Sequence, residues 1–188
     1  MLFGDVPISS ESLATLLCRN VRAGVNAFPQ NPSIGIWTAV VKDVLYREGA
    51  RRNFEVWCSG IKDCQESLLD MVWWQRNREG IALAVECEWD CRDLLRDFQN
   101  LLCTKAPLKL FIYDGGDVPE GGDKECEQIK SLMLAYRHHV EGETYLFVSF
   151  GNTGQYSYRF IVPKDGALHD VEFEPLSDVP TAPYAAVP

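Results

Sequence analysis

Apolar residues recur at helical spacing near the start of the chain. After Ser10-Glu11-Ser12 they form one face of a predicted amphipathic helix, and Ser9 or Ser10 can cap it. This face consists of Leu13, Leu16, Leu17 and Val21. A Pro-containing break at residues 28–32 precedes a second predicted helix, from about Ser33 to Gly49. Its expected buried side carries Ile36, Val40, Val44 and Leu45.

The apolar pattern then predicts three strands in succession. Residues 52–60 alternate between apolar and polar side chains, and residues 67–76 form a second run. Residues 81–89 open with five continuous apolar side chains, which is typical of a buried strand. The links between these strands are short and contain Gly60 and Gly80, so we expect antiparallel hairpins.

The spacing of apolar residues next returns to that of a helix. Residues 91–104 carry an apolar stripe, Asp90 can cap their start, and Pro107 follows their end. LKLFIYD, residues 108–114, is a short hydrophobic strand. A strand, a helix and another strand in this order predict a right-handed parallel crossover.

The remainder of the chain predicts a further helix and a hairpin. The helix covers residues 124–139, and ETYLFVSF and QYSYRFIVP form the hairpin. From Lys164 the chain becomes polar and Pro-rich, which is typical of an extended tail. We therefore predict one α/β (α+β) domain over residues 1–163, with a central mixed sheet flanked by helices, followed by a tail over residues 164–188.

Composition indicates an ordinary globular protein. The 188 residues are 46% hydrophobic and 24% charged, and no apolar run reaches membrane-spanning length. The start, MLFGDVPISSESL, lacks the basic region of a signal peptide. Seven cysteines without a CxxC pair favour reduced thiols over a zinc site. We expect a cytoplasmic protein that makes no membrane contact.

Charge is unevenly divided along the chain. Residues 1–113 contain 13 Lys and Arg against 14 Asp and Glu, whereas residues 114–188 contain 5 against 13. This distribution argues against a broad surface that coats nucleic acid. It leaves open a local basic groove that could bind nucleic acid. Such a groove would be lined by Arg47, Arg51, Arg52, Arg76 and Arg78.

Two carboxylates stand at the end of the third predicted strand. Because alternate residues of a strand point to one face, Glu86 and Glu88 should project side by side, with Cys87 on the opposite face. Like charges on a buried strand repel one another and are costly to desolvate. A bound cation or a proton would relieve that cost, and a hard cation such as Mg²⁺ suits oxygen ligands.

The order of a helix, three strands, a helix and a strand, with acids on the second and third strands, resembles the PD-(D/E)XK, or restriction-endonuclease-like, superfamily. The resemblance covers residues 33–113 and implies an αβββαβ core. Asp70 matches the acid of the second strand, and Glu86 matches the (D/E) of the third. No Pro precedes Asp70, and Glu88 stands where the family usually has Lys.

The resemblance implies roles for further residues. Glu48, at the end of the preceding helix, matches an extra metal-binding acid of some members. Lys105, or else Lys109, is the candidate for the missing basic residue, since some members carry it on the following helix. Asp97 and Asn100 are candidate partners behind the metal ligands.

These positions imply metal-dependent hydrolysis of phosphodiester bonds in nucleic acid. Asp70 and Glu86 would hold Mg²⁺ or Mn²⁺, and Glu88 would act as general base or as an extra ligand. The alternative is a catalytically degenerate member of the fold that binds a basic protein partner through its acidic surface. A homodimer is compatible with either. A P-loop, a nucleophile elbow and a dinucleotide fingerprint are absent from the sequence, which disfavours a small-molecule enzyme.

Overall fold

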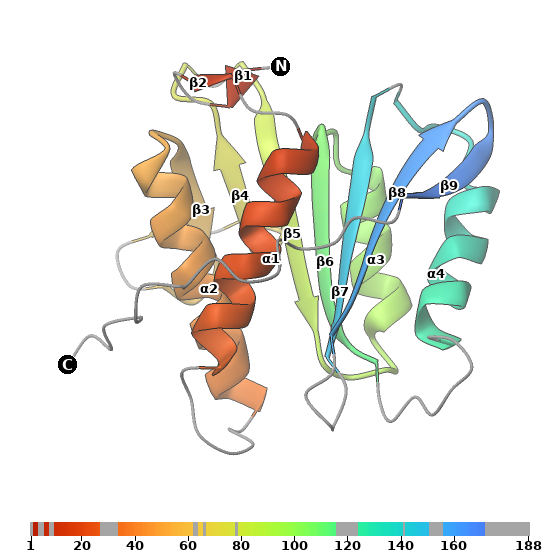
Figure 1. The fold of residues 1–188 in the computed structure, drawn as a ribbon, viewed down its shortest axis with the longest axis horizontal. Coiled ribbons are helices and arrows are strands. Elements are labelled where there is room, and N and C mark those ends of the chain that lie inside the picture. Colours follow the sequence, from red (N-terminus) through yellow and green to blue (C-terminus); the bar gives the residue numbers. More distant parts are fainter. Residues whose placement is uncertain are drawn as a thin grey trace.

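The computed structural model describes residues 2–3, 6–7, 10–26, 34–61, 64–65, 67–77, 79–115, 124–140, 142–150 and 156–171. Within these ranges the chain is an α/β protein with four helices and a seven-stranded mixed sheet (Figure 1). The helices are α1 (Ser10–Asn26), α2 (Ile34–Arg51), α3 (Leu94–Cys103) and α4 (Lys124–Ala135). The sheet contains β3 (Glu55–Cys58), β4 (Met71–Trp74), β5 (Ile81–Glu88), β6 (Leu108–Asp114), β7 (Thr144–Phe150), β8 (Tyr156–Lys164) and β9 (Ala167–Val171). Two short strands, β1 (Leu2–Phe3) and β2 (Val6–Pro7), pair with each other.

The strands of the sheet lie side by side in chain order, from β3 to β9. β3, β4 and β5 pair antiparallel, which confirms the two predicted hairpins. β5, β6 and β7 pair parallel, which confirms that β5 and β6 are parallel strands joined through α3. β7 and β8 form the predicted terminal hairpin, and β9 adds one further antiparallel strand.

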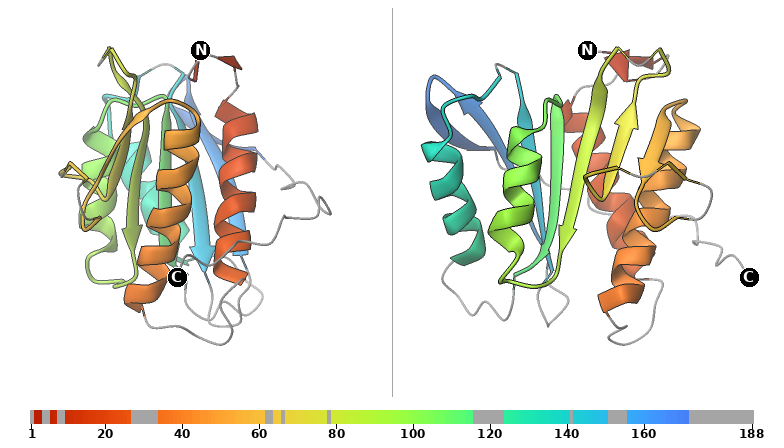
Figure 2. Two further views of the ribbon diagram at one scale, coloured as in Figure 1. Left: turned by 90° about the vertical axis from the view of Figure 1, so that its left-hand side faces the viewer. Right: turned by 180° about the vertical axis from the view of Figure 1, so that it is seen from behind.

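The sheet has helices on both faces. α1 and α2 cover one face, and α3 and α4 lie on the other (Figures 1 and 2). The side chains of β5 divide between the two: Val85 and Cys87 pack toward α1 and α2, whereas Ala84 packs on the side of α3. Burial on both faces explains why this strand opens with an unbroken apolar run. Among the described residues no helix is long and apolar enough to cross a membrane.

Two predicted boundaries shift in ways that affect the candidate site. β4 begins at Met71, so Asp70 directly precedes the strand instead of lying within it. α3 begins at Leu94 with Asp93 at its N-cap, not Asp90. The carboxylate of Asp90 is instead engaged by the main-chain N–H and the guanidinium of Arg92. Local hydrogen bonds of this kind compete with helix capping.

The sheet extends beyond the predicted domain boundary at residue 163. Asp165 and Gly166 connect β8 to β9, and both have positive φ angles, 52° and 73°. A two-residue loop with positive φ at both positions matches the right-handed twist of the flanking strands, and Asp-Gly is a favoured sequence for it. Part of the predicted tail is therefore strand, while residues 172–188 lie outside the described residues.

The second helix passes through its predicted end and packs closely on the sheet. α2 continues past Gly49 to Arg51, while Ile36, predicted to be buried, is 44% exposed. A Cβ atom at position 49 would lie 2.6 Å from Val56 Cγ2 and 2.7 Å from the indole of Trp73. Gly49 is thus the point at which the helix backbone touches β3 and β4.

We expect Gly49→Ala to destabilise the protein, although alanine is the better helix former. Overpacking a core typically costs about 1–3 kcal/mol. In a chain of this size each kcal/mol lowers the melting temperature by about 2–4 °C. The matched control is Gly35→Ala in the same helix, where nothing lies within 4 Å of the new Cβ. Melting curves that rank the Gly49 variant at or above the Gly35 variant would contradict this packing.

Candidate functional site

Asp70 and Glu86 meet where β4 begins beside β5. Met71 is paired with Val85, so Asp70 stands next to Glu86 on the neighbouring strand. The main-chain N–H of Asp70 donates to Glu86 Oε2 over 3.1 Å. In return, the main-chain N–H of Cys87 donates to Asp70 Oδ2 over 2.8 Å. Two acids predicted from separate strands are thus brought together by reciprocal hydrogen bonds.

The carboxyl group of Glu86 is held in an unfavourable environment for a charge. Its side chain lies on the α3 side of the sheet, and the residue is only 5% exposed. Burial, and after it the charge of Asp70, raises the pKa of Glu86 to about 8. At neutral pH Glu86 therefore keeps a proton unless a cation takes its place.

A second pair of carboxyl groups adjoins the first. Glu88, half-buried at the end of β5, accepts a 2.6 Å hydrogen bond from the main-chain N–H of Asp90. Desolvation, and after it the carboxyl group of Asp97, raises the pKa of Glu88. Asp97 also acts on Glu86, because the first turn of α3 faces the end of β5. The structure therefore gathers four of the predicted side chains, Asp70, Glu86, Glu88 and Asp97.

Lys42, which is not among the predicted site residues, joins this cluster from α2. Its Nζ atom lies 2.6 Å from Asp70 Oδ1. The available signal was its position on α2, between the fully buried Val41 and Leu45. A lysine that interrupts the buried side of a helix needs an acceptor, because a buried ammonium group is costly when unpaired.

Glu48 is buried elsewhere. Its carboxylate binds Arg51 and Arg52 over 2.8 and 2.6 Å and accepts a hydrogen bond from Asn20 of α1. Glu48 follows Lys42 by six residues, which is about 9 Å along a helix axis. The structure therefore places this acid in an ion-pair network of its own, apart from Asp70 and Glu86.

The two lysines predicted as the basic residue lie away from the carboxylates. Lys105 is exposed beyond the C-terminal end of α3, whereas Asp97 lies near its start. Lys109 is fully buried, and its Nζ is 2.9 Å from the Tyr145 hydroxyl and 3.1 Å from Glu143. Burial lowers the pKa of Lys109.

Asn100, predicted to stand behind the metal ligands, is exposed on α3, nearly a turn beyond Asp97. Its main-chain oxygen accepts a hydrogen bond from Thr104. Asp97, its predicted companion, is the one that faces the carboxylates.

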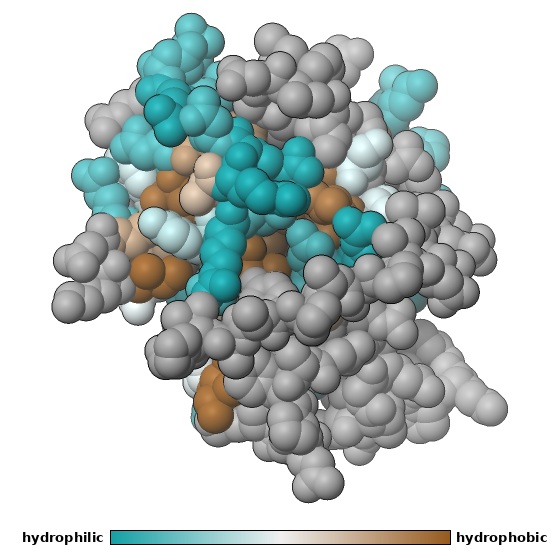
Figure 3. Space-filling view, turned by 60° about the vertical axis from the view of Figure 1, so that its left-hand side comes forward, coloured by the Kyte–Doolittle hydropathy of each residue, from teal (hydrophilic) through white to brown (hydrophobic). Residues whose placement is uncertain are grey.

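The predicted groove arginines that the structure describes lie toward the opposite end of β3, β4 and β5. Arg47 pairs with Asp43, Arg51 and Arg52 pair with Glu48, Arg76 donates to the oxygen of Asn53, and Arg78 lies outside the described residues. A view from the side of α2 and β3 shows hydrophilic side chains in a band beside hydrophobic ones (Figure 3). Nearer the carboxylates, Arg92 and Arg96 stand at the start of α3, with their side chains 84% and 67% exposed.

The carboxylates offer the ligand type that a hard cation prefers. Among the described residues, no three or more His, Cys, Asp or Glu side chains are arranged as a cage for a metal ion. Mg²⁺ does not require such a cage, because it commonly uses one or two protein carboxylates and takes its other ligands from water and substrate phosphates. Asp70 and Glu86 meet that requirement.

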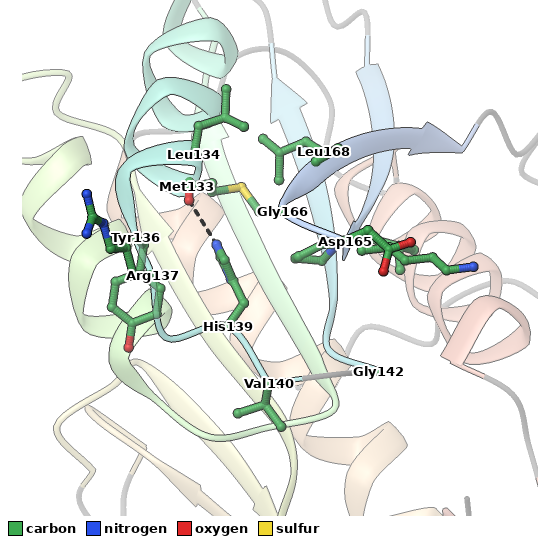
Figure 4. A pocket seen from close by; sticks show the side chains of 14 residues that line it. Met133, Leu134, Tyr136, Arg137, His139, Val140, Gly142, Asp165, Gly166 and Leu168 are labelled. Carbon is green, nitrogen blue, oxygen red and sulfur yellow. Dashed lines mark hydrogen bonds between the residues drawn. The ribbon is translucent and has the colours of Figure 1, made fainter.

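A hollow of about 780 Å³ lies in a different part of the molecule. It is bounded by the end of α4 and by the β8–β9 hairpin (Figure 4). His139 points into it and lies 2.8 Å from the carbonyl oxygen of Met133 through Nε2. Much of its lining is exposed side chains, including Arg137 and Lys164. We place the candidate site at the carboxylates, because one buried and three partly buried carboxyl groups converge there.

Comparison with known proteins adds no family to this geometry. No family model matches the chain, and neither a curated protein nor a solved structure matches it. Function is therefore inferred from the carboxylates, from Lys42 and from the elements that hold them.

We expect Glu86→Gln to change how stability depends on pH. In metal-free buffer the folded protein keeps the Glu86 proton up to about pH 8, whereas an ordinary glutamate loses it near 4.5. The wild type therefore loses stability relative to the Gln variant as pH rises between these values, by at most about 1.4 kcal/mol per pH unit. Urea unfolding from pH 5 to 9 in the presence of EDTA measures this difference.

Glu79→Gln is the control, because Glu79 is an exposed acid in the link before β5. That variant should follow the wild type at every pH. A stability difference between wild type and Glu86→Gln that does not change with pH would contradict the raised pKa of Glu86.

Proposed function

We propose that this chain hydrolyses phosphodiester bonds in nucleic acid with the help of a divalent metal ion, on a restriction-endonuclease-like core. The observation that carries the proposal is the contact between Asp70 and Glu86. Two acids in hydrogen-bonded proximity, one of them 5% exposed, form a place that favours a cation.

The order of elements supports the proposed core. α2, β3, β4, β5, α3 and β6 follow one another as a helix, three antiparallel strands, a helix and a parallel strand. Asp70 stands immediately before the second of these strands, and Glu86 lies on the third. The resemblance implies this order of elements, but with Asp70 on the second strand instead of directly before it.

Asp70 and Glu86 would hold Mg²⁺ or Mn²⁺. When such an ion is bound, its charge polarises the scissile phosphodiester, stabilises the leaving oxygen and lowers the pKa of a bound water. Glu86 would release its proton to solvent in order to bind the ion, and the main-chain N–H of Cys87 keeps Asp70 in place.

Glu88 is the proposed general base. Its pKa is raised by desolvation and by Asp97, which moves its proton affinity toward the working range of a base at neutral pH. The contact with Asp97 on α3 contributes to that rise, and the main-chain N–H of Asp90 holds one oxygen of Glu88. A base at this position takes over the proton-handling role for which the family usually has a lysine.

Two exposed cations support a phosphate-bearing substrate. Arg92, just before α3, pairs with Asp90, and Arg96, in its first turn, pairs with Asp93 and Asp97, while both side chains remain largely exposed. Guanidinium groups bind phosphate oxygens in a bidentate manner and would position a nucleic-acid backbone over the carboxylates. We propose a reducing compartment such as the cytoplasm, which the seven free thiols support.

A second candidate function has an observation of its own. Lys42 already neutralises Asp70, which a catalytically degenerate member of the fold could use to hold its former site together. Such a protein would bind a basic partner through the acidic half of the chain, residues 114–188. Metal-dependent activity separates this alternative from the proposed hydrolase.

We expect hydrolysis of single- or double-stranded DNA or RNA in Mg²⁺ or Mn²⁺, and loss of that activity in EDTA. Asp70→Asn and Glu86→Gln should each lower the rate by at least about a hundredfold, since even partners behind metal ligands contribute 10–100-fold. Cleavage of labelled oligonucleotides, quantified on denaturing gels, measures these rates.

Glu79→Gln, an exposed acid outside the site, should retain full activity. The proposed function would be contradicted if purified wild type cleaved none of the four substrates in either metal. It would also be contradicted if the Asp70→Asn and Glu86→Gln variants cleaved as well as wild type.

A further inference from the structure

We propose that Lys42 is a positioning residue that acts through Asp70 and weakens divalent-metal binding at the Asp70–Glu86 pair. Its ammonium group sits on one oxygen of the acid that would bind the metal, and so competes with the metal for the same negative charge. This inference rests on the proposed function, because it concerns the metal affinity of the same site.

The contacts of Lys42 are those of an anchored cation. Its Nζ atom is 2.6 Å from Asp70 Oδ1, and it donates to the main-chain oxygen of Ser59 over 3.1 Å and to the Ser59 hydroxyl over 2.9 Å. These three acceptors use all three N–H groups of an ammonium. The Lys42 side chain is only 13% exposed and that of Asp70 only 22% exposed.

Ser59 ties this arrangement to the sheet. It directly follows β3, and its main-chain N–H donates to the main-chain carbonyl oxygen of Asp70 over 3.1 Å. Its hydroxyl also lies 3.3 Å from Asp70 Oδ1. Because Ser59 supplies two of the three acceptors, Lys42 would keep these two hydrogen bonds if the carboxylate of Asp70 bound a metal.

The remaining atoms of Asp70 explain why the ammonium matters for a metal. Oδ2 accepts the N–H of Cys87, and the N–H of Asp70 binds Glu86. The negative charge on Oδ1, the oxygen nearest to Lys42, is therefore less compensated by main-chain hydrogen bonds than the charge on Oδ2. A fixed positive charge beside that oxygen repels an incoming divalent cation, and partial burial strengthens the repulsion by lowering the effective dielectric.

A purely structural role for Lys42 predicts something different. If the lysine only fastened α2 to β3 and β4, its removal would lower stability and leave metal affinity unchanged or reduced. If it competes with the metal, removal of its charge must raise affinity even though stability falls. The sign of the change in metal affinity therefore separates the two roles.

Titration calorimetry with Mn²⁺ alone tests the inference on the 188-residue chain. Lys42→Met, which keeps the length of the side chain without its charge, should bind Mn²⁺ more tightly than wild type, on the order of tenfold. Lys42→Arg, which keeps the charge, should remain within about twofold of wild type. The control is Lys164→Met, an exposed lysine at the end of β8.

Circular dichroism and a melting curve verify that each variant is folded, and Lys42→Gln replaces the Met variant if that variant does not fold. If wild type binds Mn²⁺ and the folded neutral variants bind it no more tightly, the inference about Lys42 is overturned while the proposed function stands. Binding only after Lys42 is neutralised would support the inference and count against the proposed hydrolase. Absence of binding in every variant would overturn both.

Discussion

The close approach of Asp70 and Glu86 is the constraint on which this part of the molecule depends. Asp70 uses its main-chain N–H to hold Glu86, one carboxylate oxygen to receive the N–H of Cys87, and the other to bind Lys42. One residue therefore links the start of β4, the end of β5 and the buried side of α2. The same contacts force two acids together, so the fold is stabilised around a repulsion that a proton or a cation must relieve.

This arrangement is costly for a site that serves stability alone. Apolar residues of similar volume often stabilise a protein as well as a buried ion pair, or better. Concentrated, poorly solvated charge is common where a protein has to bind or react. The contrast with Glu48 is instructive, because that acid is equally buried but is matched by two arginines and an asparagine. The four carboxyl groups around Glu86 outnumber the two cations paired with them, Lys42 on Asp70 and Arg96 on Asp97, and they face the exposed start of α3.

Much of the fold could be predicted from the sequence because it follows from local periodicity. The unbroken apolar run of β5 identified a strand buried on both faces, and the helical stripe of α3 between two strands identified a parallel crossover. β9 escaped prediction although its Asp165-Gly166 turn is a strong hairpin signal, since its five residues, ALHDV, do not alternate between apolar and polar side chains and the strand lies at the edge of the sheet.

The site could be predicted only in part. Strand alternation placed Glu86 and Glu88 on one face, and the element order singled out Asp70. Lys42, Glu48 and Lys105 could not be assigned in this way, because their partners depend on how α2 and α3 lie against the sheet. A helix position has no fixed register with a strand, and a long flexible side chain leaves several acceptors within reach.

Anomalous diffraction from crystals grown with Mn²⁺ tests the central claim most directly, because it locates the metal without reference to activity. We predict an anomalous peak in coordinating contact with the carboxylates of both Asp70 and Glu86. Crystals that contain Mn²⁺ only elsewhere, with the Lys42–Asp70 ion pair undisturbed, would contradict the assignment of these acids as a metal site.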